Sequence, residues 1–408
     1  MRILFLTPQL PYPPHKGTSL RNLHLIKGLA ASHEVHLLTF AEGGASLALP
    51  GQLKELCSSV QVVAAPKRSL LKRLASLLCS PYPDMASRLV SLEFASKLRD
   101  ALRLLAPEAI QVEGLEMARY YLDMPPSAES PAVVLDEHNA EYVLQKRAFE
   151  VERRMLPRWF AALYSLIQWQ KLERYERIAC RRATAVITVS DEDRQALLRM
   201  NPGLDATVVP NGVDTTYFLP WPAKRREGST LLFTGTMDFR PNVDAAVWFV
   251  DEVFPLVRRD VPQARLLIVG GSPTRKVKAL GSASVEVTGF VEDVRPYMAE
   301  AAVYVIPIRI GGGVRFKALE AMASGLPVVS TTMGVEGISV RVGDDLLLAD
   351  DASSFASAVV RLLRDPELGQ QMASRARRLI EQQYDWNAIM PRLDELYLRL
   401  SQTRGAYR

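Results

Sequence analysis

The sequence alternates short apolar runs with helical segments, and this alternation begins twice. At the first start, the apolar run Ile3–Thr7 leads through a Pro- and Gly-rich loop into a helical period over Ser19–Ala31 and a second apolar run, Glu34–Phe40. A strand, a crossover helix and a strand in this order predict a parallel sheet. Further strands are expected at Val60–Ala64, Ala109–Val112, Ala132–Leu135 and Ala185–Val189, and Thr207–Asp214 is expected to be a strand that ends in a turn. The longest helix is expected at about Arg158–Arg182.

The second start follows a segment that is typical of a linker. Pro220, Pro222 and the polar stretch Ala223–Ser229 interrupt the pattern. Each half of the chain is therefore predicted to be its own doubly wound α/β unit. In the second half we expect strands at Thr230–Thr234, Arg265–Val269, Val285–Thr288, Val303–Ile306 and Pro327–Ser330, and helices at Val243–Leu256, Phe316–Ala323, Asp351–Arg364 and Leu368–Gln383.

The length of the chain suits this division. With 408 residues, 48% of them apolar, it has room for two cores of ordinary domain size. We predict an N-terminal domain over residues 1–218, a second domain over 219–385 and a C-terminal helix within 386–408. The pattern does not show where this helix docks, and packing back on the N-terminal domain is one option. Ligands bind outside the carboxyl ends of the strands in such sheets, so two facing units predict a cleft.

The charged, cysteine and histidine residues exclude several classes of protein. A net charge of +5 suits anionic partners such as nucleotides or acidic lipid headgroups, or a solvated basic surface, but not nucleic acid. Cys57, Cys79 and Cys180 are far apart and odd in number, so neither a disulfide framework nor a zinc site is expected. The five histidines lack the paired spacing of a metal site, and no metal or other cofactor is predicted.

The N-terminus and the hydropathy pattern predict a cytoplasmic protein. Pro8 ends the first apolar run before it reaches the length of a signal sequence, and no run reaches the ~18 apolar residues of a membrane span. Two segments, Arg68–Leu78 and Arg154–Arg182, mix cations with apolar residues at helical spacing. Either could contact the inner face of an anionic membrane; the alternative is a core-facing helix with a solvated back.

The strongest candidate site is the glycine-rich segment before the helix Phe316–Ala323. The glycines Gly311–Gly313 allow a ligand to approach backbone N–H groups closely. A helix N-terminus favours an anion such as phosphate, and Arg315 and Lys317 add positive charge at the same end. Glu320, about one turn into the helix, could accept paired hydrogen bonds from a ribose diol. The alternative is a tight turn with solvated basic residues.

A second candidate site follows the strand Ala132–Leu135. His138 stands there among Asp136, Glu137 and Asn139, at a strand end where a side chain can face a ligand. A packed or surface histidine is the alternative.

Other strand and helix ends supply further candidates for ligand contacts. Glu113 follows the strand Ala109–Val112 in the same way as His138 follows its strand. Gly17 lies before the first helix and could line a ligand site or form a simple turn. Arg21 and Asn22 are either helix-surface residues or ligand contacts, and the sequence does not separate these.

Together these segments resemble the retaining glycosyltransferases of family 4, which have the GT-B fold: two facing doubly wound Rossmann-like domains with a cleft between them. The family signature reads Glu-Gly-Phe-Gly, four residues, then Glu-Ala-Met-Ala-x-Gly-x-Pro-Val-Val. It matches this chain at Gly313, Leu319, Glu320, Ala321, Met322, Ala323, Gly325, Pro327, Val328 and Val329. The resemblance spans nearly the whole chain, including the first loop with Gly17, Val189–Asp193, Val209–Asp214, Phe233–Met237 and Thr288–Val294.

The resemblance implies roles for individual residues. His138 corresponds to the family's active-site histidine, which lies near the donor sugar and the acceptor. We predict that Arg315 and Lys317 also act in catalysis. The implied donor-binding residues are Gly235, Thr236, Arg240, Phe290, Gly311, Gly312, Gly313, Val314 and Glu320. From their places at strand and helix ends, the residues that we predict for the acceptor side are Gly17, Arg21, Glu113 and Asn139.

Two positions depart from the family pattern. The first acid of the paired-Glu motif, which contacts the donor sugar near its 3-hydroxyl, is Gly312 here, so the identity of the sugar is open. The pyrophosphate-binding Arg and Lys of the family are missing after Gly235, where only Arg240 is near. We expect Arg315 and Lys317 to supply that charge, because a diphosphate leaving group needs cationic stabilisation when no metal is bound.

The sequence thus predicts a metal-independent hexosyltransferase in cell-surface polysaccharide or glycolipid synthesis. It would move a sugar from a nucleoside diphosphate sugar to a hydroxyl of a saccharide or lipid-linked saccharide, with retention. The alternatives are a sugar-nucleotide epimerase or sugar-phosphate synthase on the same fold, and a non-catalytic assembly subunit, which Gly312 keeps open. A Rossmann dehydrogenase is disfavoured, because no Gly-x-Gly-x-x-Gly follows the first strand. The sequence names neither sugar, base, acceptor nor oligomeric state.

Overall fold

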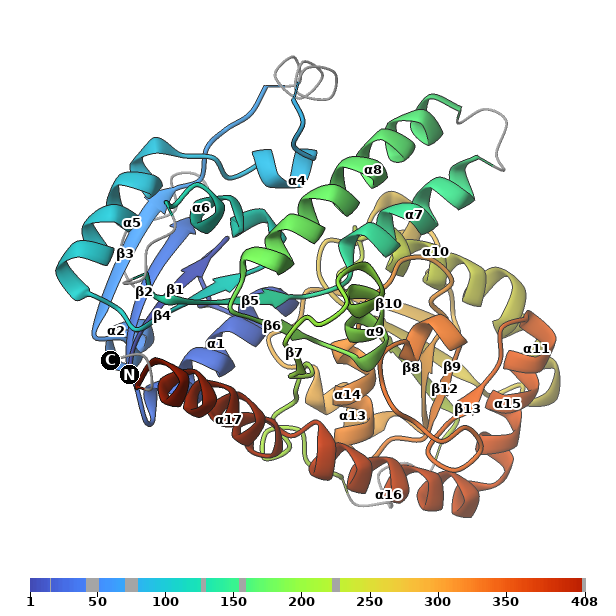
Figure 1. Cartoon of the computed structure of the whole chain (residues 1–408). Helices are drawn as coiled ribbons and strands as arrows, with labels where there is room; N and C mark the ends of the chain where they lie inside the picture. Colours follow the sequence, from blue (N-terminus) through green and yellow to red (C-terminus); the bar gives the residue numbers. More distant parts are fainter. Residues whose placement is uncertain are drawn as a thin grey trace. The chain divides into compact units, whose positions relative to one another are not determined.

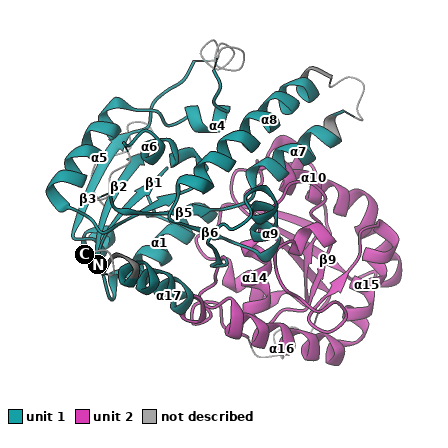
Figure 2. Cartoon of the chain, in the orientation of Figure 1, with its two compact units in different colours: residues 1–210, 390–408 teal, residues 211–389 magenta. Residues whose placement is uncertain are grey.

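The computed structural model describes residues 1–14, 16–41, 51–69, 80–125, 130–153, 159–221 and 228–405 (Figure 1). Its contacts divide the chain into two compact units (Figure 2): unit 1 holds residues 1–210 and 390–408, and unit 2 holds residues 211–389. The C-terminal residues from Met390 onward thus belong to unit 1, although they follow unit 2 in the chain. The basic segment Arg68–Leu78, Cys79 and the predicted linker lie largely outside the described residues.

The described part of unit 1 contains seven parallel strands in the order β3-β2-β1-β4-β5-β6-β7. They are β1 (Arg2–Thr7), β2 (Glu34–Ala41), β3 (Ser59–Ala64), β4 (Ala109–Glu113), β5 (Ala132–Glu137), β6 (Ala185–Thr188) and β7 (Ala206–Val208). The chain moves from β1 to β2 and β3 on one side and returns with β4 on the other. β1 and β4 therefore form the switch point at which a doubly wound sheet binds its ligand.

Helices connect these strands, and α7 and α8 form a helical hairpin (Figure 1). Ser91 and Ser190 directly precede α5 and α9, and each side chain caps its helix by accepting a hydrogen bond from a backbone N–H of the first turn. The helical segments are α1 (Gly17–Ala30), α2 (Gly51–Leu56), α4 (Asp84–Ser87), α5 (Leu92–Leu105), η1 (Leu115–Met117), α6 (Arg119–Leu122), α7 (Glu141–Glu152), α8 (Trp159–Arg182), α9 (Asp191–Met200) and, from residue 390 on, α17 (Trp386–Gly405).

In unit 2 the described residues form six parallel strands in the order β10-β9-β8-β11-β12-β13. They are β8 (Thr230–Thr234), β9 (Arg265–Val269), β10 (Val285–Gly289), β11 (Val303–Ile306), β12 (Val328–Ser330) and β13 (Leu347–Leu348). The switch point lies between β8 and β11. The helices include α12 (Arg275–Lys278), α13 (Arg295–Glu300), α14 (Phe316–Ala323), η5 (Thr332–Val335), α15 (Ala352–Arg364) and α16 (Pro366–Gln383).

The helix predicted over Val243–Leu256 is present, but it is longer than expected and contains a π-helical turn. The segment forms α10 (Arg240–Trp248), a π-helical turn (Phe249–Val253) and α11 (Phe254–Asp260). Pro255 has no N–H to donate to the preceding turn, so the regular ladder of hydrogen bonds is interrupted before it.

The central strands of both sheets are buried along their length. No residue of β4, β5, β8 or β11 is exposed. A parallel sheet that is covered by helices on both faces needs such near-continuous apolar runs, which is why these strands could be found from the sequence.

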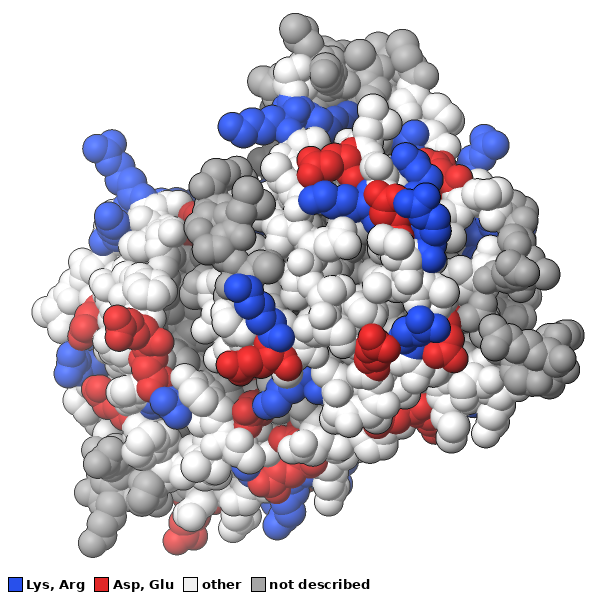
Figure 3. Space-filling view, turned by 90° about the vertical axis from the view of Figure 1, so that its left-hand side faces the viewer, with Lys and Arg blue, Asp and Glu red and all other residues white. Residues whose placement is uncertain are grey.

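The surface shows no dominant charge on the face seen in Figure 3, where Lys and Arg lie beside Asp and Glu. None of the helices that the structure describes has the length and apolar character needed to cross a membrane.

Gly270 lies where two loops of unit 2 touch. Its φ is +153°, and a Cβ atom there would lie 1.8 Å from the backbone oxygen of Gly235. We predict that Gly270→Ala lowers the free energy of unfolding by at least about 2 kcal/mol, because backbone rather than a flexible side chain would have to move. Urea unfolding measures this loss.

Gly203→Ala is the matched control. Gly203 also has a positive φ, +86°, but nothing lies within 4 Å of the added Cβ. It should cost about 1 kcal/mol from backbone strain alone. Equal losses in the two variants would contradict the steric argument at Gly270.

Candidate functional site

The loops after β8 and β11 bring bare backbone to the switch point of unit 2. Gly235 has a φ of +150°, Gly311 of +107° and Gly313 of +81°. L side chains rarely adopt these values, so glycine is required for the observed loop conformations. The carboxyl edge of the sheet therefore presents peptide groups without side chains over them.

Helix α14 begins beside these glycines without a side-chain cap. The first N–H groups of such a helix have no partner within it and carry partial positive charge. Arg315 adds its guanidinium, since a Cβ atom on Gly311 would lie 3.0 Å from Nη2. Nε and Nη2 of Arg315 are buried and have no hydrogen-bond partner among the described residues. Unsatisfied donors at an uncapped helix end are suited to an anion.

The side chain of Lys317 extends from α14 to the loop after β8, where its ammonium group lies. Its Nζ donates to Oδ1 of Asn242 over 2.8 Å and lies 4.5 Å from the ring centre of Phe233. Nδ2 of Asn242 donates to the carbonyl of Thr236 over 2.9 Å, so the lysine and the loop share a hydrogen-bonding partner. A Cβ atom on Gly235 would lie 2.7 Å from Nζ.

Partial burial shifts the pKa values of the charged groups at this site. Burial raises the pKa of Glu320 to about 7, against the charge of Lys317. Burial and then the charge of Arg315 lower the pKa of Lys317 to about 7, while Glu320 opposes them. Burial also lowers the pKa of Arg315, against the charge of Glu336. An added anion would compensate for the lost hydration of both cations.

The remaining donor-side candidates lie on the same edge of the sheet. Thr236 and Arg240 are exposed after β8, and Phe290 is 73% exposed after β10. Gly312 and Val314 are partly exposed in the loop before α14. Their roles in binding stay predictions.

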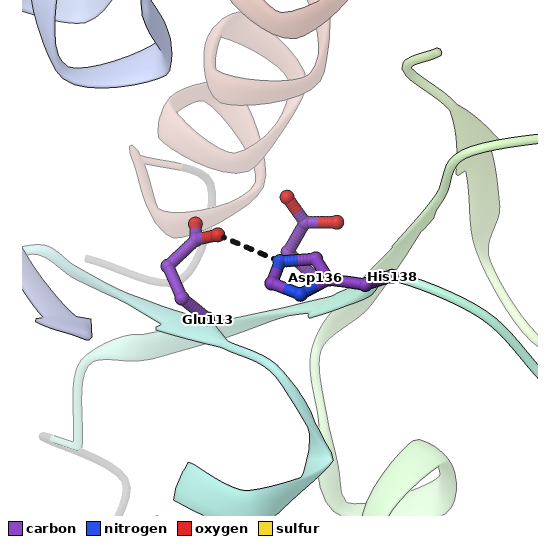
Figure 4. Close-up of side chains that lie close together, drawn as sticks. All are labelled: Glu113, Asp136 and His138. Atoms are coloured by element: carbon purple, nitrogen blue, oxygen red, sulfur yellow. Dashed lines mark hydrogen bonds and ion pairs between the residues drawn. The ribbon is translucent and has the colours of Figure 1, made fainter. Parts of the chain in front are cut away.

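In unit 1, three polar residues meet at the carboxyl ends of β4 and β5 (Figure 4). Glu113 is the last residue of β4 and pairs in register with Asp136 of β5, so the strand ends bring the two carboxyl groups side by side. His138 follows β5, and its Nε2 lies 3.2 Å from Oε2 of Glu113. Two candidates from separate strand ends thus share one hydrogen bond.

Arg21 of α1 is the partner of Asp136. Its Nε and Nη2 donate to the two carboxylate oxygens over 2.8 and 3.0 Å, and its Nη1 donates to the carbonyl of Pro210 over 3.1 Å. Arg21 is 1% exposed and Asn22 is fully buried, so the helix-surface interpretation is wrong for both. Any acceptor-side role of Arg21 would have to act through Asp136. A signal existed, because both residues lie one turn before the buried apolar stripe of α1.

Opposing influences set the charges of this cluster. Burial and the charge of Asp136 raise the pKa of Glu113, while His138 lowers it. Burial lowers the pKa of His138, but the hydrogen bond to Glu113 and the charge of Asp136 raise it by more. The three residues lie close enough to ligate a metal ion, yet Arg21 already binds both oxygens of Asp136. The absence of a metal from the reaction stays a prediction.

The other candidates near this site form no side-chain hydrogen bond with the cluster among the described residues. Gly17 is exposed as the first residue of α1. Nδ2 of Asn139 donates to Oε1 of Glu141 over 3.3 Å. Glu137 is fully buried, and burial followed by the charge of Glu176 raises its pKa well above the usual range.

Sequence reasoning missed two residues of the cluster. Nε2 of Gln111 in β4 donates to Oε1 of Glu113 over 2.9 Å, and the hydroxyl of Tyr397 donates to Oε1 of Gln111 over 2.6 Å. A glutamine inside an otherwise apolar strand was a usable signal. Tyr397 gave none, because its partner is distant in sequence.

Comparison with known proteins places both units in described families. Residues 16–217 match the family Glycosyltransferase Family 4, and residues 228–365 match the family Glycosyl transferases group 1. Over 397 residues the chain is 21% identical to an uncharacterized 44.6 kDa protein in the cps region of Klebsiella pneumoniae, covering 94% of this chain and 96% of that protein. Over 209 residues it is 29% identical to a phosphatidyl-myo-inositol mannosyltransferase of Mycolicibacterium smegmatis, covering 49% of this chain and 53% of that protein.

Solved structures share the architecture over nearly the full length. Sucrose-phosphate synthase from Thermosynechococcus elongatus has a TM-score of 0.74 at 19% identity, covering 99% of this chain and 100% of that chain. HepE of Anabaena in complex with UDP has a TM-score of 0.67 at 16% identity, covering 98% of this chain and 100% of that chain. The predicted fold class, GT-B with two Rossmann-like parallel sheets, is confirmed.

Lys317 gives unit 2 a pH dependence that can be measured without a ligand. Its pKa is about 7 in the folded chain against an ordinary 10.5, so the unfolded chain binds more protons between these values. The stability of the wild type should therefore rise relative to Lys317→Met as the pH increases across this window, by up to about 5 kcal/mol. Urea unfolding at several pH values measures the difference.

Lys278→Met, at an exposed position of α12, is the control. Its stability difference from the wild type should not change with pH in this way. If the stability difference between the wild type and Lys317→Met does not change with pH, the ammonium group of Lys317 is not desolvated in the folded chain.

Proposed function

This chain belongs to the group 1, family 4 glycosyltransferases with the GT-B fold, and we propose that it transfers a sugar from a nucleoside diphosphate sugar to a hydroxyl acceptor with retention of configuration. One observation carries the proposal. At the switch point of unit 2, Arg315 and Lys317 meet an uncapped helix end and a bare glycine loop. The donor would bind to unit 2, and the acceptor to unit 1.

The donor's diphosphate is the group that fits this end of α14. Its charge suits the uncapped N–H groups and the unpartnered donors of Arg315. Lys317 places its ammonium beside Gly235 and Asn242, next to the loop where the family's pyrophosphate-binding cations usually lie. This position supports the charge compensation expected from the sequence. A bound diphosphate would raise the pKa of Lys317 and favour its charged form.

Glu320 is the group that we assign to the ribose of the donor. It lies one turn into α14 beyond Lys317, and its two carboxylate oxygens can accept hydrogen bonds from neighbouring hydroxyls. The charge of Lys317 favours the ionised form that this role needs.

The proposed transfer needs no protein base. The acceptor hydroxyl would attack the anomeric carbon on the face from which the diphosphate departs; the bond from this carbon to the diphosphate oxygen breaks, and the diphosphate takes the hydroxyl proton. Arg315 and Lys317 would stabilise the charge that develops on the leaving group. His138 is the residue of unit 1 that we assign to the reaction, as the counterpart of the family's active-site histidine. We assign no metal or other cofactor to this reaction.

The relatives suggest where the reaction is used. One is named for a mannosyl transfer to phosphatidyl-myo-inositol, and another for its place in a cps region. We therefore assign this enzyme to polysaccharide or glycolipid synthesis, with a saccharide or lipid-linked saccharide as acceptor, in the cytoplasm at the inner face of the membrane. Leu163 and Tyr164 are exposed on α8, in the described part of a segment predicted to contact membrane.

A sugar phosphate is the second acceptor class to test. The full-length likeness to a sucrose-phosphate synthase favours it. Gly312, in place of the family's acid, favours the third possibility, a subunit that binds nucleotide without turnover.

A panel of UDP-, GDP- and ADP-sugars tests the proposal, with crude lipid, saccharide and sugar-phosphate acceptors. We predict that one donor releases its nucleotide in an acceptor-dependent way. Glu320→Ala should reduce kcat/KM by about 100-fold or more, through loss of paired hydrogen bonds to the ribose. Tight nucleotide binding with no turnover of any donor would contradict the transferase proposal.

Arg315→Ala should raise the KM for the donor and lower kcat, with a loss of about 10- to 100-fold in kcat/KM, because the leaving group loses a cation. Steady-state kinetics with varied donor measure both constants. Arg309→Ala is the control, since Arg309 is bound to Asp244 across 3.1 Å and should leave both constants unchanged. If KM and kcat are unchanged in Arg315→Ala, residues other than Arg315 bind the diphosphate.

A further inference from the structure

A chain of hydrogen bonds runs through unit 1 from the C-terminal helix to His138. The hydroxyl of Tyr397 on α17 donates to Gln111 over 2.6 Å, and Gln111 donates to Oε1 of Glu113 over 2.9 Å. Oε2 of Glu113 lies 3.2 Å from Nε2 of His138. Tyr397, Gln111 and Glu113 are fully buried, whereas the side chain of His138 is 18% exposed. The chain thus starts in the core and ends at a group that a substrate can reach.

The two links inside the core have a defined donor and acceptor. Because Tyr397 donates to the amide oxygen of Gln111, the amide nitrogen faces Glu113. Asn22 adds a second donor when its amide nitrogen faces Glu113, over 2.7 Å to Oε2. These donors favour an ionised Glu113, which in turn favours a hydrogen on Nε2 of His138. Nδ1 of His138 is then the nitrogen left for a substrate.

Charged groups on neighbouring elements surround the pair without replacing Glu113. Asp136 on β5 raises the pKa of His138 and Arg21 on α1 lowers it, and His138 in turn acts on Glu141 of α7. Both oxygens of Asp136 are already bound by Arg21. Glu113 is therefore the carboxylate that accepts from the imidazole.

We propose that Glu113 is the positioning residue of His138, and that Tyr397 and Gln111 hold the Glu113 carboxylate in place from α17. A helix that supplies no group to the reaction thereby fixes the tautomer and the charge of the histidine. The inference rests on the proposed function only where it gives His138 a substrate. The hydrogen-bond chain itself can be tested on the free protein.

NMR of ¹⁵N-labelled histidine in the full-length chain, without substrate, is the test. The chain has five histidines, so the spectrum of His138→Gln identifies the signal of His138. We expect the Nε2–H tautomer in the wild type above its pKa. Glu113→Gln should lower the pKa of His138 by about one to three pH units, because the paired negative charge is lost. An unchanged pKa, or an Nδ1–H tautomer in the wild type, would overturn the proposal.

Tyr397→Phe tests the contribution of α17. It keeps the charge of Glu113 but frees the amide of Gln111, so the pKa of His138 should fall by less than in Glu113→Gln. Tyr121→Phe is the matched control: Tyr121 is also buried in unit 1, and its hydroxyl donates to the carbonyl of Ala179 over 2.7 Å. It should leave the pKa of His138 in place. If the pKa of His138 shifts equally in the two variants, or does not shift in Tyr397→Phe, then α17 does not hold the Glu113 carboxylate in place.

The pH profile of kcat separates this inference from the proposed function. With a donor identified by the panel, the profile of Tyr397→Phe should move with the pKa of His138, while the donor KM stays constant. If the NMR shifts occur and the kinetic profile does not move, the hydrogen-bond chain stands and the role of His138 in the reaction is wrong.

Discussion

The parallel sheets set the constraint on which the rest of this structure depends. A sheet that helices cover on both faces buries its strands along their length, so polar side chains gather where the strands end. In unit 1 the carboxyl groups of Glu113 and Asp136 stand at such ends, and in unit 2 the glycine loops and α14 do. Charged and hydrogen-bonding groups therefore lie at the carboxyl edge of each sheet. The strand order places the switch point at this edge, which is where a doubly wound sheet binds its ligand.

The two units treat buried charge differently. In unit 1 the charges are paired within the chain: Arg21 binds Asp136, and Glu113 shares a hydrogen bond with His138. In unit 2, Arg315 and Lys317 lie together without a carboxylate bound to either among the described residues, and burial lowers the pKa of both. Paired charges fix geometry, whereas desolvated cations gain from an anionic ligand. This difference fits a unit that positions one histidine and a unit that binds a charged donor.

Much of the fold could be predicted from the sequence. The strands at Thr230–Thr234, Arg265–Val269 and Val303–Ile306 have the bounds expected for them, because buried parallel strands are near-continuous apolar runs. The segment around Pro255 could not be predicted in detail, since the period of apolar residues continues through a π-helical turn that a missing N–H imposes. The candidate residues of unit 2 could be named from the sequence for a related reason: Gly311, Arg315, Lys317 and Glu320 lie within one short segment of the chain.

By itself the sequence determined the fold class, the family and the order of groups along the glycine-rich segment, because these depend on local period and on neighbouring residue types. Only the tertiary structure decided that Lys317 reaches the loop of Gly235, that Arg21 is buried against Asp136, and that Tyr397 is connected to His138. The partners in these contacts are distant in sequence. Strand order, strand register and the orientation of each helix decide which side chains come into contact. The residues next to one another in the sequence do not determine these features.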